Sequence, residues 1–165
     1  MKPKLLSLAL TVALVFTAAP GLAVNLGQSA PALTVSDASG PLDMNQFKGK
    51  FLYVDFWASW CGPCVKSFPW MNEMQAKYGP QGLVILGVNT DSKREDADKF
   101  LARVPAKFRI AFDPRGDAAT LYEVQAMPSS FLIGPDGKLL LKHAGYRDEQ
   151  KAELEQSIAS ALSKK

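Results

Sequence analysis

The chain has 165 residues, 19 basic and 16 acidic side chains and a formal net charge of +3, and 47% of its residues are hydrophobic. A chain of this length and composition can form one domain with its own hydrophobic core. The small net charge gives no indication of a nucleic-acid partner or of a strongly anionic one.

The first 23 residues have the pattern of a secretory signal peptide. Lys2 and Lys4 precede an apolar run over residues 5–19, and a small-x-small tripeptide ends at Ala23. The run is about 15 residues long, shorter than the roughly 20 that span a bilayer, which favours a cleaved peptide over a retained anchor. We therefore expect cleavage after Ala23, a periplasmic location, and a soluble mature domain over residues 24–165 with a net charge near +1.

The elements that follow alternate between strand and helix. Short apolar runs at 51–57 and 82–88 are typical of strands buried on both faces, and residues 64–79 between them have apolar side chains at helical spacing. The later elements are expected as a helix over 92–104, a strand over 108–113, a short helix over 116–124, two strands flanking the turn at 135–137, and a last helix that ends near 162 with Asp148 as its N-cap. This order predicts an α/β domain in which a central mixed sheet has helices on both sides.

Cys61 and Cys64 are the only cysteines, and they stand where the first buried strand leads into the first helix. Three positions apart at a helix start, their Cα atoms should lie about 5 to 6 Å apart, within the range that a disulfide allows. A bridge that closes so short a loop constrains the unfolded chain very little, which argues against a structural role. The helix N-terminus stabilises a thiolate, so Cys61 is predicted to be the nucleophile and Cys64 the resolving thiol.

Metal and haem sites are weaker interpretations of this pair. A structural zinc site needs four ligands as a rule, and His143 is the only histidine that could add to the two cysteines. Covalent haem attachment needs a histidine after the second cysteine, where this chain has Val65. Copper(I) binding by two thiolates remains open as an alternative. No cofactor and no metal are expected, and the chain has no flavin or nicotinamide fingerprint.

The stretch VDFWASWCGPC, residues 54–64, resembles the active-site strand and helix start of thioredoxin, and Pro69 matches the proline inside that helix. Residues 26–162 as a whole resemble exported thioredoxin-like proteins of the TlpA/ResA group, to which the cytochrome c maturation reductants also belong. The resemblance implies a thioredoxin fold with an N-terminal extension and a central insertion.

The same resemblance implies roles for residues outside the cysteine pair. Pro128 matches the cis-proline that lies against the two cysteines, with Met127 before it, and the backbone there can pair with an extended substrate segment. Trp60 is expected on the active-site surface. Gly62 and Pro63 form the thioredoxin dipeptide, which favours a reducing potential, and Pro63 fits the first turn of the helix.

Asp55 is the remaining predicted site residue. It stands in the middle of an apolar strand, where an unpaired carboxylate is costly, and it matches the buried acid of thioredoxin. Members of the ResA group carry a glutamate three residues after the second cysteine, but this chain has Ser67 there. We therefore predict that Asp55 takes the proton of Cys64. Trp57 and Trp70 are expected in the core, and His143 is expected to be structural.

The predicted function is a periplasmic thiol-disulfide oxidoreductase that reduces disulfides of exported proteins. Apocytochrome c and metal-site cysteines are the candidate substrates that the resemblance implies, and a membrane protein is the expected electron donor. The alternatives are an oxidase or isomerase that uses the same cysteines in disulfide formation, and a copper(I)-binding module. A peroxiredoxin is a weaker alternative, because its peroxidatic cysteine normally stands without this CxxC helix start.

Overall fold

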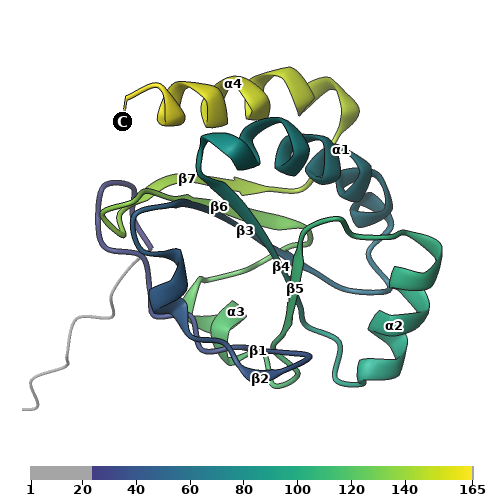
Figure 1. Cartoon of the computed structure of the whole chain (residues 1–165). Helices are drawn as coiled ribbons and strands as arrows, with labels where there is room; N and C mark the ends of the chain where they lie inside the picture. Colours follow the sequence, from purple (N-terminus) through teal and green to yellow (C-terminus); the bar gives the residue numbers. More distant parts are fainter. Residues whose placement is uncertain (1–23, 165) are drawn as a thin grey trace, which may run out of the picture.

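The computed structural model describes residues 24–164, which form one mixed sheet with helices on both faces (Figure 1). The predicted signal peptide, residues 1–23, lies outside the described residues. Within the described part, seven strands stand in the order β2-β1-β5-β4-β3-β6-β7. Their bounds are β1 Ser36–Asp37, β2 Gly40–Pro41, β3 Phe51–Trp57, β4 Leu83–Asn89, β5 Arg109–Phe112, β6 Ser129–Ile133 and β7 Leu139–Ala144. No helix among residues 24–164 is long and apolar enough to cross a membrane.

The centre of the sheet is parallel, and its edges are antiparallel. Strands β3, β4 and β5 run parallel, whereas β6 pairs antiparallel with β3, and β7 with β6. All seven residues of β3 are buried, because this strand has a neighbour on each side and a packed layer on each face. The predicted central mixed sheet is confirmed.

The helices are divided unequally between the two faces. They are α1 Gly62–Tyr78, α2 Arg94–Arg103, α3 Asp117–Leu121 and α4 Lys151–Leu162, with 3-10 turns η1 Met44–Phe47, η2 Gly79–Gln81 and η3 Asp148–Gln150. The chain steps from β3 to β4 to β5 in one direction across the sheet, so right-handed crossovers place α1 and α2 on the same face. Side chains of α1, α2 and α4 share one core cluster, and α3 belongs to the cluster on the opposite face (Figure 1).

The alternation of β3 distributes its side chains between these two clusters. Phe51, Tyr53 and Trp57 pack under α1, whereas the even-numbered side chains of the strand pack on the α3 face. Trp57 is fully buried between Phe68 of α1 and Phe100 of α2, at ring-centroid distances of 5.0 and 4.8 Å. The prediction that Trp57 is a core residue is confirmed.

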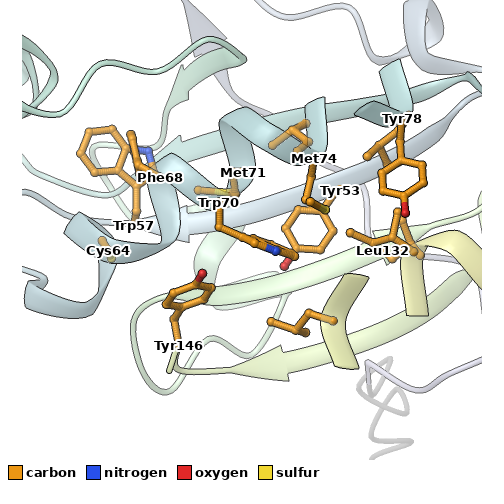
Figure 2. Packing of buried hydrophobic residues seen from close by; sticks show 14 of the residues in the cluster. Tyr53, Trp57, Cys64, Phe68, Trp70, Met71, Met74, Tyr78, Leu132 and Tyr146 are labelled. Carbon is orange, nitrogen blue, oxygen red and sulfur yellow. The ribbon is translucent and has the colours of Figure 1, made fainter. Parts of the chain in front are cut away.

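Along α1, the buried side chains follow the helical spacing seen in the sequence. Phe68, Trp70, Met71 and Met74 are buried against the sheet, and Trp70 packs between the rings of Tyr53 and Tyr146 (Figure 2). The predicted core position of Trp70 is confirmed, and Met71 and Met74 of the same helix are buried as well.

Several predicted boundaries differ from the structure. The charged helix and the short helix are each trimmed at both ends, to Arg94–Arg103 and Asp117–Leu121. Asp148 is not the N-cap of the last helix, because the chain first makes the turn η3, and α4 begins at Lys151. The carboxylate of Asp148 instead pairs with Lys151 at 2.9 Å.

The N-terminal extension adds strands that the sequence pattern did not indicate. Strands β1 and β2 have two residues each, too few to show a periodicity, and β1 pairs with the edge of β5. Asp37 at the end of β1 accepts hydrogen bonds from Arg109 of β5, with an Nη2 to Oδ2 distance of 2.6 Å. This ion pair fixes the extension to the parallel part of the sheet.

Candidate active site

Cys61 and Cys64 form a disulfide in the structure, and their Cα atoms lie 5.4 Å apart, as the spacing predicted. Cys61 is the N-cap of α1, with extended backbone angles, and its Sγ accepts a hydrogen bond from the backbone N–H of Cys64 at 3.2 Å. Gly62 and Pro63 occupy the first positions of the helix, where the missing N–H of proline is tolerated. The sulfur of Cys61 therefore lies among the free N–H groups of a helix start, which favour a thiolate.

The two cysteines differ in their exposure to solvent. Cys64 is completely buried in the cluster with Trp57 and Phe68 (Figure 2). Cys61 retains 4% of its surface. Trp60, directly before Cys61, is 72% exposed. A substrate sulfur can therefore approach Cys61 beside an exposed aromatic ring, while Cys64 is closed to solvent.

Asp55 is buried in the middle of β3, and its side chain has one hydrogen-bond partner among the described residues. Its Oδ2 accepts a hydrogen bond from the hydroxyl of Ser130 at 2.6 Å, and the two residues are paired in register across β3 and β6. Its Oδ1 is buried without a partner within residues 24–164. Burial raises the pKa of Asp55 to about 7, and the Ser130 bond opposes that rise only in part.

The strand alternation places Asp55 on the α1 face of the sheet, the same face as Tyr53 and Trp57. The charged form of Asp55 and burial both raise the pKa of the Tyr53 hydroxyl, with burial the larger cause. Cys64 belongs to the cluster on this face, so the predicted proton acceptor and the predicted resolving thiol share one side of the sheet. An acid with a pKa near 7 is suited to accept and release a proton at neutral pH.

The loop that contains Pro128 lies at the same end of the sheet. The Met127–Pro128 peptide bond is cis, as the resemblance implied, and Pro128 is buried directly before β6. Met127 packs against the cluster that contains both cysteines, and its Sδ accepts a hydrogen bond from the Thr90 hydroxyl at 3.5 Å.

Ser67 and His143 complete the residues that the sequence singled out. Ser67 is buried, and its hydroxyl donates to the carbonyl oxygen of Cys64 at 3.2 Å, so it contacts the backbone of the helix and does not replace an acid. His143 on β7 pairs in register with Ser130 on β6, and its Nε2 is buried without a partner in the part of the chain that the structure describes.

Sequence reasoning missed the polar groups that surround the cysteine loop from other strands. The Ser130 hydroxyl donates to Asp55. At the end of β4, the Asp91 carboxylate accepts from the Ser59 backbone N–H and from the side-chain amide of Asn89. The available signal was the Asn-Thr-Asp run directly after a buried parallel strand. Because the carboxyl ends of parallel strands meet at one edge of the sheet, that run had to lie near the end of β3 and hence near Cys61.

Residues 25–158 match the family model for Redoxin. The chain belongs to the Redoxin family. Among curated relatives of this Redoxin-family chain, the thiol-disulfide oxidoreductase ResA of Bacillus thuringiensis is 34% identical over 131 residues, which are 79% of this chain and 76% of that protein.

Solved structures similar to this Redoxin-family protein have the same fold. One, assigned as a thiol:disulfide interchange protein DsbE from Chlorobium tepidum, has 50% identity and a TM-score of 0.81, covering 84% of this chain and 99% of that one. Another, assigned as a protein disulfide isomerase from Bacteroides thetaiotaomicron, has 25% identity and a TM-score of 0.76, covering 86% and 92%. The fold is thioredoxin-like, and the protein is a thiol-disulfide oxidoreductase of the ResA/DsbE type with Cys61 and Cys64 as its CxxC pair.

Proposed function

We propose that this protein is an exported reductant that transfers two electrons from its dithiol to disulfides of other exported proteins. The main support is the asymmetry of the cysteine pair, with Cys61 at the helix start beside exposed Trp60 and Cys64 buried on the face that contains Asp55. The names of the curated relatives, thiol-disulfide oxidoreductase ResA, agree with exchange chemistry of this kind. Apocytochrome c and metal-site cysteines are the proposed substrate classes.

The proposed reaction has two exchange steps. The Cys61 thiolate attacks one sulfur of the substrate disulfide, so a Cys61–substrate bond forms, and the other substrate sulfur leaves as a thiolate and is protonated. Asp55 then takes the proton of Cys64, and the Cys64 thiolate attacks Cys61, which expels the second substrate thiol. The substrate gains two electrons and two protons, and the Cys61–Cys64 disulfide remains.

The cycle then needs a source of electrons. Reduction of the Cys61–Cys64 disulfide by a second dithiol, which we assign to a membrane electron-donor protein, restores the starting state. The Gly62-Pro63 dipeptide favours the reducing direction, since reported potentials run from about −270 mV for thioredoxin to about −120 mV for DsbA. A reduction potential near that of DsbA, about −120 mV, would instead support an oxidase or isomerase.

Export is proposed from the first 23 residues and their cleavage after Ala23, which would leave a mature chain beginning at Val24. Sequencing the N-terminus of the protein recovered from a periplasmic extract tests this directly. A protein that retains Met1 or fractionates with membranes would contradict cleavage.

The decisive experiment traps substrates in the cell. Cys64→Ser removes the resolving thiol, so Cys61 should accumulate in mixed disulfides that mass spectrometry can identify, and the double variant Cys61→Ser/Cys64→Ser is the matched control. Capture of a few exported proteins with cysteine pairs supports a dedicated reductant. A broad set of unrelated partners would contradict dedication, and tight copper(I) binding with no trapped partner would support the copper(I) module.

A further inference from the structure

A three-residue segment at the end of β4 forms hydrogen bonds with both loops of the active site, the one before Cys61 and the one before Pro128. We call Asn89, Thr90 and Asp91 the β4 bracket. Asn89 is the last residue of β4, and the segment leads toward α2 at the carboxyl edge of the parallel strands. Asn89 is fully buried and Asp91 is 8% exposed, so two polar side chains are held inside the protein beside the loop that precedes Cys61.

The Asp91 carboxylate accepts three hydrogen bonds, two from that loop and one from Asn89 within the bracket. Its Oδ2 accepts from the backbone N–H of Ser59 at 2.9 Å and from the Asn89 side-chain amide at 2.7 Å, and its Oδ1 accepts from the Ser59 hydroxyl at 3.0 Å. The Asn89 Oδ1 in turn accepts from the Asp91 backbone N–H at 3.1 Å. Both oxygens of the carboxylate are therefore used, and Ser59 is held by its backbone and its side chain together.

Thr90 extends the same bracket to the second loop. Its backbone N–H donates to the Trp57 carbonyl oxygen at 3.0 Å, and its hydroxyl lies 3.4 Å from that oxygen and 3.5 Å from the Sδ of Met127. The bracket thus contacts the chain on the Cys61 side and the residue before Pro128. One short segment therefore contacts both loops.

The Asp91 carboxylate accepts these hydrogen bonds, but none of its donors has a positive charge that would neutralise it. All three donors are neutral, and Arg94, a basic residue at the start of α2, pairs with Asp98 instead at 2.9 Å. Ser59 is two residues before Cys61, and two peptide units span at most about 7 Å. A poorly screened negative charge within roughly 10 Å of Cys61 opposes the helix start and disfavours the thiolate.

We propose that Asp91 is a positioning residue for thiol-disulfide exchange: it fixes the loop that presents Cys61, and its negative charge limits how strongly the Cys61 thiolate is stabilised. A less stable Cys61 thiolate makes the reduced form of the pair less stable relative to the disulfide. The dithiol is then a stronger reductant. The inference rests on the exchange chemistry of the family and not on the identity of the substrate, the proposed direction or export.

Other titratable side chains also lie on the elements packed around the start of α1. They include Asp55 of β3, Lys66 and Glu73 of α1, Lys93 directly before α2, Asp148 of η3 and Tyr146, and Lys66 pairs with Asp148 at 3.5 Å in an exposed position. A substitution at Asp91 leaves all of these in place. A change in the Cys61 thiolate can therefore be attributed to the Asp91 carboxylate.

The first test removes the charge with Asp91→Asn and uses Asp113→Asn as the matched control. Asp113 is another buried acid, 4% exposed and directly after β5. Its backbone N–H donates to the Asn89 carbonyl oxygen at 2.8 Å, but its carboxylate accepts from the Ala119 N–H of α3 at 2.9 Å, so Asp113→Asn leaves the backbone contact with the bracket in place. The Cys61 thiolate is titrated by its ultraviolet absorbance in the Cys64→Ser background, and the equilibrium with glutathione is measured in the two-cysteine protein.

We expect Asp91→Asn to raise the thiolate fraction at pH 6 and to shift the glutathione equilibrium toward the dithiol form about tenfold, the effect of one charge near 10 Å at an effective dielectric of about 20. Asp113→Asn should change neither quantity. Unchanged titration and equilibrium in a folded Asp91→Asn protein, or equal changes in both variants, would overturn the proposal.

A second variant keeps the proposal testable if Asp91→Asn does not fold. Ser59→Ala, at a partly exposed position, removes one of the two hydrogen bonds that Ser59 donates to the Asp91 carboxylate and leaves the charge in place. The rate of reaction of Cys61 with a peptide disulfide should fall several-fold, with the thiolate titration unchanged. A wild-type rate in Ser59→Ala would contradict the positioning role of this contact.

Discussion

Replacing Asp55 by asparagine should make the oxidised protein more stable, and the gain should depend on pH. Asp55 is 1% exposed, and burial raises its pKa to about 7, from 3.8 for an unperturbed aspartate. Asparagine has the same shape, and its side-chain oxygen can still accept the hydrogen bond from Ser130. The substitution therefore removes mainly the ability to ionise.

The sign and size of the effect follow from proton linkage. Below about pH 4 the carboxyl is protonated in both the folded and the unfolded chain, so it gives no pH-dependent difference in stability. Between about pH 4 and 7 the unfolded chain releases the proton and the folded protein retains it, so the free energy of unfolding falls. The pKa difference of roughly three units corresponds to a loss of about 4 kcal/mol, which is complete above pH 7.

The assay is denaturant unfolding of the oxidised wild type and of Asp55→Asn, followed by tryptophan fluorescence from pH 4 to 8.5. The variant should gain stability over wild type as pH rises, by up to about 4 kcal/mol at pH 8. Asp98→Asn, at an exposed position of α2, is the control and should show no such gain. Ser130→Ala removes the hydrogen bond that lowers the Asp55 pKa, so its loss of stability should extend to higher pH.

A constant difference between Asp55→Asn and wild type over the whole pH range would refute this reasoning. It would mean that the carboxylate ionises in the folded protein as easily as in the unfolded chain. Asp55 would then be unsuited to take the proton of Cys64 near neutral pH.

Four further predictions concern the reaction and the core. Cys61→Ala should abolish reduction of a model disulfide in an insulin assay while circular dichroism shows an unchanged fold. Asp55→Asn should slow resolution of the mixed disulfide in stopped-flow kinetics and flatten its dependence on pH between about 6 and 9, with the first attack by Cys61 nearly unchanged. Pro128→Ala should lower turnover or allow the thiols to capture metal, measured by activity and metal content. Gly87→Ala should destabilise the protein by about 1 to 3 kcal/mol in denaturant unfolding, because its Cβ would lie 3.0 Å from the Phe108 ring.

Each of these has an outcome that contradicts it. Near wild-type activity of Cys61→Ala would reject the nucleophile, and an unchanged resolution rate would reject the acid-base role of Asp55. Unchanged turnover together with unchanged metal content in Pro128→Ala would argue against an active-site position for that proline. A Gly87→Ala protein as stable as wild type would show that the surrounding side chains can move to admit a methyl group.

Some parts of the site were predictable because they are local in the chain. Cys61 and Cys64 are three residues apart at a helix start, so the helical geometry alone places their Cα atoms within disulfide range, and the structure has them at 5.4 Å. The apolar run Phe51–Trp57 indicated a strand buried on both faces, and every residue of it is buried. The same run marked Asp55 as an unusual buried acid before any partner was known.

Other parts of the site were not predictable, because their partners come from distant segments. Asp148 has the residue type and the position of an N-cap, but the chain makes the 3-10 turn η3 before α4 begins. Its carboxylate pairs instead with Lys66 of α1 and with Lys151 at the start of α4. Strands β1 and β2 pair with each other, and β1 pairs with the edge of β5, while their own residues show no strand pattern. Tertiary contacts decided both cases over local preference.

The sequence by itself determined the redox pair, its position at a strand–helix junction and the class of fold, since these depend on residue spacing and on the period of apolar residues. Only the tertiary structure decided which groups surround the pair. Ser130 reaches Asp55 across 75 residues and Asp91 reaches Ser59 across 32, through a strand order and register that no local pattern specifies. The raised pKa of Asp55 is likewise a property of the packed sheet and helix, because burial is its main cause.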